Sequence, residues 1–308
     1  MLDNPLPSIL NSDEVKKDIE KHFADQVKLF RDLTAYGTNL IIRAFDSSKK
    51  DLSDIVVCGV LLKHIVAMLD AVEILLTNGM VIAAFLSSRS AFEASIYLDW
   101  ILFSDKEKKA KCYIVANLRN GQQWASRAIE GTTEAQAFNE TVKSLNLNLH
   151  ELDPNLASDA RLHLAEIKRI LAQPNFSEVN ADFDRVKGTK IYDPEWYKVV
   201  GAKSIRNVAK SVGRLPEYEL FYTKGSKISH AASYNDHIRF NKGKISFKTI
   251  RNLENVDQLV RFAAGTAIIS FRNIIGYYRA SELDSFKIKY STEWRKAWLS
   301  VRSVEYKT

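Results

Sequence analysis

An arginine and a glutamate stand where a helix would bring their side chains together. Arg89 and Glu93 are four residues apart in the apolar stretch 80–103, and residues at this spacing are neighbours on a helix. Bulky apolar side chains project on the same side of the expected helix, namely Ile82, Phe85, Leu86, Ile96 and Trp100. We therefore expect the pair to be buried. It would either tie the core together or form a polar pocket, in which Arg89 binds an anion and Glu93 orients it or moves a proton.

The segment from Tyr222 to His237 carries a second polar cluster. If it is helical, Lys227 and His230 share one face. A nearby ammonium group disfavours a charged imidazolium, so His230 would suit a general base. In the alternative interpretation, His230 packs at a helix end and bonds a backbone carbonyl. His237 is interpreted as structural. The residues expected to bind an anion beside His230 are Lys224, Lys227, Arg206, Tyr222 and Ser229.

Several common chemistries lack their sequence motifs. The chain has no P-loop, no dinucleotide-binding fingerprint and no Gly-x-Ser-x-Gly sequence. No His-Glu-x-x-His or Cys-x-x-Cys pair indicates a metal site. The two cysteines, Cys58 and Cys112, lie in apolar helical patterns and are expected to be buried and unreactive. His64, on an apolar helix face, is expected to be a core histidine. The sequence thus predicts neither a metal nor a cofactor.

The elements that must position these residues are almost all helical. Only 12 glycines and 6 prolines interrupt 308 residues, which favours long helices. Helices are expected over 12–45 with an interruption near Gly37, then over 54–78, 80–103, 105–129, 132–145, 155–172, 195–212, 216–233 and 253–281, with a loop over 173–194. Alternating residues around Gly243 predict a β-hairpin near residues 238–248. The predicted fold class is all-α, a multi-helix bundle with long buried central helices and this one small hairpin.

The sequence predicts that the chain divides into three consecutive segments. Residues 1–52 form an N-terminal helical segment, residues 53–250 a core domain with the Arg/Glu/His cluster, and residues 251–308 a C-terminal helix and a basic, aromatic tail. The aromatic residues near the C-terminus would close the core or serve as a contact surface; they are Phe271, Tyr277, Tyr278, Trp294 and Trp298.

Composition and charge narrow the class of protein and its partners. Apolar residues make up 46% and charged residues 26% of the chain, as is usual for a globular protein with a real core. The apolar stretches 55–76 and 80–103 contain charges that are costly in lipid, and the N-terminus lacks a signal-peptide pattern, so we expect a cytoplasmic protein without a membrane span. From residue 201 onward, 20 Lys and Arg face 9 Asp and Glu. This excess suggests an anionic partner such as RNA or a nucleotide, although a solvated basic surface has the same signature.

With these residues in view, the chain resembles a bacterial family known as domain of unknown function family 5677. The segment from Ser88 to Ala94, which contains Arg89 and Glu93, looks like the family's Arg-x-x-x-Glu helix. The segment 196–230 looks like its Tyr…Ser-x-x-x-His ending, except that Ser229 directly precedes His230. The resemblance spans roughly residues 60–240. It implies an all-helical bundle in which the Arg/Glu helix faces the His helix.

A looser similarity links the chain to HEPN-type helical domains, many of which cut RNA in toxin or antiviral systems. Their active motif is an Arg followed four to six residues later by His, and here that spacing holds Lys224. An arginine from another helix, Arg89 or Arg206, would then supply the guanidinium group.

These observations leave three hypotheses open. The first is a metal-independent ribonuclease, a toxin or phage-defence effector in which His230, Arg89 and Glu93 are catalytic. The second is a binding or scaffold module, dimeric or bound to a partner protein, whose polar cluster is structural. The third is a sensor that binds a small anion or nucleotide at Arg89.

Overall fold

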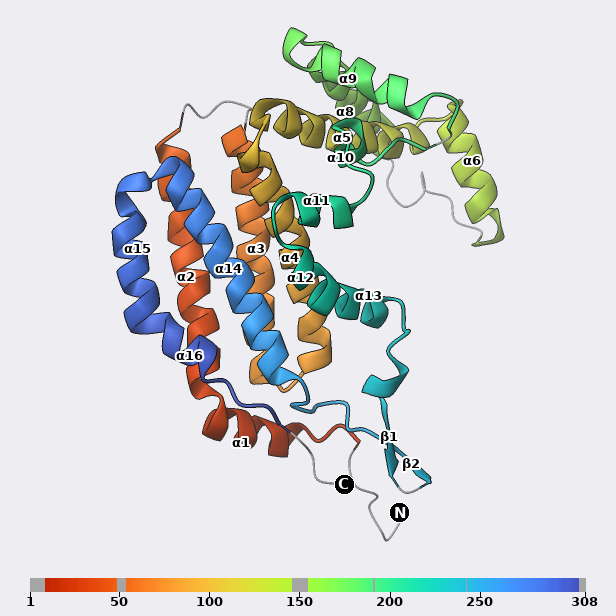
Figure 1. The fold of residues 1–308 in the computed structure, drawn as a ribbon. Helices are drawn as coiled ribbons and strands as arrows, with labels where there is room; N and C mark the ends of the chain where they lie inside the picture. The colour runs from red at the N-terminus through yellow and green to blue at the C-terminus, as the bar shows by residue number, and fades with distance from the viewer. Residues whose placement is uncertain (1–8, 49–53, 146–154, 191, 242, 305–308) are drawn as a thin grey trace. The chain divides into compact units, whose positions relative to one another are not determined.

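The structure, a computed structural model, describes residues 9–304 except 49–53, 146–154, 191 and 242. The chain forms two units (Figure 1). Unit 1 comprises residues 1–104 and 206–308, and unit 2 comprises residues 105–205. This division differs from the three consecutive segments 1–52, 53–250 and 251–308, because unit 2 interrupts unit 1 between helices that pack together.

Four long helices pack side by side in unit 1 (Figure 1). They are α2 (Ala24–Asp46), α3 (Asp54–Thr77), α4 (Val81–Phe103) and α14 (Val256–Tyr278). Helix α3 lies against α2 and α4, and α14 closes the bundle by contacting α2, α3 and α4. Met80 and Asn252 form a parallel bridge just before α4 and α14, so these two helices start at the same end of the bundle. Fully buried apolar side chains fill the space between the helices, including Phe30, Leu33, Phe92 and Phe271.

Shorter elements cover this bundle. They are α1 (Ser12–His22), α11 (Ile205–Ser211), α12 (Leu215–Glu217), the π-helical turn η2 (Tyr218–Tyr222), α13 (Thr223–Ser229), η3 (Tyr234–Asp236), β1 (Ile238–Asn241), β2 (Lys244–Phe247), η4 (Ala280–Glu282), α15 (Leu283–Lys289), η5 (Tyr290–Trp294) and α16 (Arg295–Leu299). Helix α13 packs on α4, and α16 packs on α2 and α14. Trp294 is fully buried and its ring meets Tyr36 of α2 edge-on at 5.2 Å. The C-terminal aromatics Phe271 and Trp294 therefore close the core.

Unit 2 is built around one helix, α5 (Lys106–Arg127). Its other elements are α6 (Thr133–Val142), η1 (Lys143–Leu145), α8 (Leu156–Leu171), α9 (Pro174–Lys187) and α10 (Trp196–Val199). Helices α6, α8, α9 and α10 all contact α5. Arg119 of α5 donates hydrogen bonds to both carboxylate oxygens of Asp193, at 2.8 and 3.0 Å, and to Asn180 of α9 at 2.8 Å. This arginine holds α9 and the segment after it against α5.

The all-α prediction with one hairpin is confirmed. In the hairpin, β1 and β2 pair antiparallel, with Ile238 opposite Phe247 and Asn241 opposite Lys244. The loop prediction for 173–194 is wrong, since α9 occupies most of it. Pro174 stands in the first turn, where its missing N–H is harmless, and the apolar residues that α9 buries follow helical spacing at Phe176, Val179 and Phe183.

The interruption predicted near Gly37 is also misplaced. The break between α1 and α2 falls at Phe23, and Gly37 lies inside α2. A Cβ atom at residue 37 would come within 2.5 Å of Val66 Cγ2 and 2.8 Å of Phe271 Cζ. Glycine is therefore required here for close packing of α2 on α3 and α14, and it does not end the helix.

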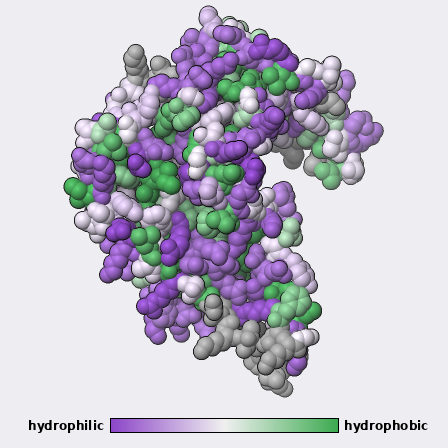
Figure 2. Space-filling model, in the orientation of Figure 1, coloured by the Kyte–Doolittle hydropathy of each residue, from purple (hydrophilic) through white to green (hydrophobic). Residues whose placement is uncertain are grey.

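Two helices of unit 1 are long and apolar enough to span a membrane by length and composition alone, α3 over Ile55–Thr77 and α14 over Val256–Tyr278. The same pattern is typical of the core helices of a bundle, and the larger part of the α14 segment is buried here. On the face drawn in Figure 2, hydrophobic residues lie in separate groups among hydrophilic ones and form no continuous band.

Both cysteines are buried thiols outside any disulfide, as predicted. Burial raises the pKa of the Cys112 thiol to about 11, and the thiolate is the reactive form. We expect neither Cys58 nor Cys112 to react with a disulfide reagent at about pH 8 while the protein is folded, and both to react in denaturant. A thiol titration with and without urea measures this. Rapid labelling of Cys112 in the folded protein would contradict the packing of α5.

Candidate functional site

Arg89 and Glu93 of α4 meet through a tyrosine. An Nη2–H of Arg89 donates to the Tyr222 hydroxyl at 2.8 Å, and this hydroxyl donates to Glu93 Oε2 at 3.0 Å. The Arg89 guanidinium also lies 4.4 Å from the centre of the Tyr222 ring and 3.8 Å from Glu93 Oε2. Burial, followed by the nearby Glu93 carboxylate, raises the pKa of the Tyr222 phenol above its usual value, so the hydroxyl keeps its proton. The three groups form one connected polar cluster, in which the buried Nε of Arg89 has no described acceptor.

A glycine lets α13 approach this cluster closely. A Cβ atom at Gly225 would lie 2.8 Å from the Cβ of Arg89 and 3.1 Å from its Cδ. The backbone of α13 therefore rests on the aliphatic part of the Arg89 side chain. On the other side, Tyr218 stacks on Tyr222 with ring centres 4.7 Å apart. Arg89 thus positions both η2 and α13 on α4.

The expected deep burial of the pair is wrong. The side chains of Arg89 and Glu93 are 27% and 33% exposed. Their partners are Tyr222 of η2 and Gly225 of α13, and these short elements cover less of α4 than the long helices α3 and α14 do. The i, i+4 contact itself is as predicted.

His230 does not join the Arg89–Glu93 pair. It follows the last residue of α13, is exposed, and its imidazole makes no hydrogen bond or ion pair with any described residue. Lys227, one turn earlier, is also exposed and without a described partner. Ser229 donates its hydroxyl hydrogen to the Ser226 carbonyl oxygen at 2.8 Å. The structure thus places a free imidazole and a free ammonium group together at one end of α13.

Two other predicted anion-binding residues already have partners. Lys224 points into unit 1, where its Nζ lies 4.6 Å from the centre of the Phe85 ring and donates to Gln258 Oε1 at 3.3 Å. Burial lowers the pKa of this ammonium group. Arg206 forms an ion pair with Glu219 at 2.6 Å on the exposed surface. Neither residue is poised beside His230 as a free cation.

The hairpin that follows α13 and the residues on either side of it expose aromatic and apolar side chains. They are Tyr234, Phe240, Ile245, Phe247 and Ile250. Figure 2 shows hydrophobic side chains at this corner of unit 1, at lower right. Arg239 and Lys248 both pair with Glu254, whereas Lys244 is exposed and has no described partner. The chain from α13 to β2 therefore carries two exposed lysines without a described partner, Lys227 and Lys244, and three exposed aromatic rings.

A buried ion pair of unit 1 involves residues that are not among the predicted site residues. Arg214, just before α12, donates from Nη1 to Asp99 Oδ2 at 3.0 Å and to Ser95 Oγ at 3.3 Å, and from Nε to Glu217 Oε1 at 2.7 Å. Asn273 of α14 donates to Asp99 Oδ1 at 2.6 Å. The Arg214 and Asp99 side chains are each only 7% exposed. The sequence signal that could have indicated this pair was Asp99, an aspartate inside the apolar run of α4.

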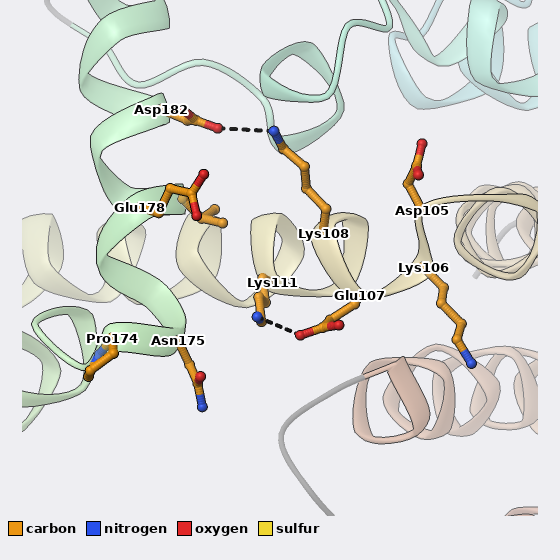
Figure 3. Close-up of a pocket in the computed structure, with 10 residues that line it drawn as sticks. Asp105, Lys106, Glu107, Lys108, Lys111, Pro174, Asn175, Glu178 and Asp182 are labelled. Carbon is orange, nitrogen blue, oxygen red and sulfur yellow. Dashed lines mark ion pairs between the residues drawn. The ribbon is translucent and has the colours of Figure 1, made fainter.

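Unit 2 contains an open cavity of about 600 Å³ between α5 and α9 (Figure 3). Charged side chains of both signs line it, including Lys108, Lys111, Glu107 and Asp182. Lys108 pairs with Asp182 at 3.3 Å and Lys111 with Glu107 at 2.7 Å, as the dashed lines show. Because these lysines are already neutralised, the cavity has no free cation set to hold an anion.

The remaining histidines offer no metal site. Among the described residues, no group of three or more His, Cys, Asp or Glu side chains could hold a metal ion. The prediction of a core position for His64 is wrong, since the ring is exposed and its Nε2 lies 2.8 Å from Ser90 Oγ. His237 is exposed, and its carbonyl oxygen accepts the Lys248 N–H at 2.9 Å. His150 lies outside the described residues.

The chain matches the family of unknown function DUF5677 over residues 54–245, and it therefore belongs to that family. The matched region includes α3, α4, all of unit 2 and the His230 segment. No curated protein and no solved structure matches the chain.

Proposed function

We propose that the protein binds single-stranded RNA along α13 and the β1–β2 hairpin and cleaves it, with His230 as the proton-transfer group. One observation carries the proposal: an exposed imidazole without a described partner follows a free lysine by one helical turn and precedes exposed aromatic rings along the chain. Single-stranded nucleic acids are bound by surfaces on which bases stack on aromatic rings while cations contact the phosphates. Tyr234, Phe240 and Phe247 would serve as the stacking residues.

The proposed chemistry uses the 2′-hydroxyl of the RNA as the nucleophile. The His230 imidazole takes the 2′-hydroxyl proton, and the 2′-oxygen forms a bond to phosphorus while the bond from phosphorus to the 5′-oxygen breaks. The leaving 5′-oxygen takes a proton from water, and the products are a 2′,3′-cyclic phosphate and a 5′-hydroxyl. Lys227 would hold the phosphate as charge moves to its oxygens. This step uses no metal ion.

In this proposal Arg89 and Glu93 act as positioning residues. Arg89 contacts Tyr222 and supports Gly225, so it determines where α13 carries Lys227 and His230. The proposal places the protein in the cytoplasm as an RNA-cleaving effector of the toxin or antiviral type, with chemistry like that of HEPN domains.

His230→Ala should lower the rate of RNA cleavage by roughly 100- to 10,000-fold, the usual contribution of a proton-transfer group. The substrate is a fluorescent single-stranded RNA oligonucleotide, and a DNA oligonucleotide of the same sequence should stay intact because it lacks the 2′-hydroxyl. His22→Ala is the matched control, because His22 is likewise exposed at the end of a helix in unit 1. It should leave the rate unchanged.

The same experiment separates cleavage from simple binding. RNA that is bound with equal affinity by the parent and by His230→Ala, with no cleavage by either, would identify a non-catalytic binding module. A protein that neither binds nor cleaves the RNA at low salt, where phosphate contacts are strongest, would rule out the proposed surface altogether.

A further inference from the structure

Unit 1 contains a second polar site, far from His230. Asp99 is ten residues beyond Arg89 on α4, which is about 15 Å along the helix axis. An open cavity of about 740 Å³ lies at this end of the unit. Parts of α4, of the segment before α12, of α14 and of α15 line it. Small-molecule sites usually enclose about 300–1,000 Å³, so the cavity has the size of a ligand site.

The floor of the cavity is a buried charged network with an unused donor. Arg214 and Asp99, each 7% exposed, both line the cavity. The Nε and Nη1 groups of Arg214 have protein acceptors, whereas its Nη2 group has no described hydrogen-bond partner and is not sealed from the surface. The Oδ1 atom of Asn273 likewise has no described donor. A nine-tenths buried guanidinium thus offers one free edge to a bound molecule.

The rim adds a second cation and apolar walls. Arg272 of α14 lines the cavity, is exposed and has no described ion pair. Phe103 and Tyr277 are exposed aromatic lining residues, and Leu102, Ile269 and Leu283 add aliphatic surface. Asp99 and Glu217 both pair with Arg214, so Arg272 is the lining cation without a described carboxylate partner. A forked guanidinium suits a phosphate or carboxylate group.

We propose that this cavity binds a small organic anion, whose phosphate or carboxylate group contacts Arg272 and the free edge of Arg214 while its flat or apolar body lies against Tyr277 and Phe103. The proposal does not depend on the proposed RNA cleavage, because it uses none of the residues around His230. A nucleoside monophosphate and an aromatic carboxylate share this chemistry, and the test distinguishes them.

Calorimetric titration with AMP, benzoate and inorganic phosphate tests the proposal on the full chain. We expect at least one of the two organic anions to bind more tightly than inorganic phosphate and to raise the melting temperature, because the apolar walls contribute to its affinity. Binding of AMP alone would indicate a nucleotide, and binding of benzoate alone a carboxylate. Binding of neither organic anion, or equal affinity for phosphate and both of them, would overturn the proposal.

Two variants locate the bound molecule. Arg272→Glu should weaken binding roughly tenfold or more, whereas Arg161→Glu, at an exposed helical arginine of unit 2 without a described partner, should not. Gly276 lines the cavity, and a Cβ atom there would have only Leu283 Cδ2 near it, at 4.0 Å. Because a Cβ atom is accommodated there, Gly276→Phe should place its ring over the cavity and weaken binding strongly, while Gly59→Phe on α3, where a Cβ atom also has open space, should not. Affinity that survives both cavity variants would exclude this site.

Discussion

Replacing Arg214 with methionine should lower the free energy of unfolding by about 3–5 kcal/mol, because it leaves the Asp99 carboxylate buried without its counter-ion. The arginine side chain is 7% exposed and holds Asp99, Ser95 and Glu217 by hydrogen bonds. Two elements would lose their common partner at once: α4, through Asp99 and Ser95, and α12, through Glu217. Urea unfolding followed by circular dichroism measures the change.

Arg89→Met is the matched comparison. This arginine is 27% exposed, contacts one carboxylate at 3.8 Å and donates one hydrogen bond to Tyr222. A lost hydrogen bond and a half-exposed ion pair together cost about 1–2 kcal/mol. Equal losses in the two variants would show that Arg214 is no more buried than Arg89, against the packing described here.

The pH dependence of the Arg214→Met variant follows from the pKa of Asp99. Burial already raises this pKa, with Arg214 opposing the shift, so removal of Arg214 raises it further. A carboxyl whose pKa is higher in the folded than in the unfolded protein stabilises the fold as long as it is protonated. Its contribution to the free energy of unfolding is complete below the unfolded-state pKa and is lost as the pH rises through the folded-state pKa. The difference in the free energy of unfolding between the parent and the Arg214→Met variant should therefore shrink as the pH is lowered toward about 4, the pKa of an aspartate in the unfolded chain.

The contrast between the two arginines shows what local patterns can predict. The apolar and polar patterns of the sequence were sufficient to predict α3, α4 and α5 as long helices. The Arg89–Glu93 contact followed from helix geometry alone. The degree of burial of this pair could not be predicted from helix geometry, because it depends on which distant segment covers that side of α4. The segment that does so is the short helix α13.

Local sequence patterns could not predict the buried network of Arg214 and Asp99 for a related reason. Arg214 and Asp99 are separated by 115 positions, with the whole of unit 2 between them. Arg214 follows a glycine in a non-periodic segment, so nothing local indicates its burial. The partner of Asp99 is decided by tertiary packing, which also decides that Gly37 sits inside a helix against Phe271.

A chain that ends after residue 247 should fail to fold unit 1, although it contains the whole family-matched region 54–245. It lacks α14, which packs against α2, α3 and α4 and buries most of its own length. Without α14 the fully buried side chains of Leu33, Leu40 and Phe92 would lose a covering helix and meet water. We expect loss of the near-ultraviolet circular dichroism signal and rapid proteolysis of residues 9–104. A chain that ends after residue 304 is the control and should melt like the parent.

A point substitution in α14 tests the same packing without removing a helix. Phe271 is fully buried, its ring centre lies 5.7 Å from that of Tyr36, and it occupies the space beside Gly37. Phe271→Ala should lower the free energy of unfolding by about 3–5 kcal/mol, the usual effect of emptying a large core site. Phe103→Ala, at an exposed residue on α4, should change it little. If the shortened chain and Phe271→Ala both melted as the parent does, residues 1–247 would be a complete folding unit, and α14 would not be needed for the bundle.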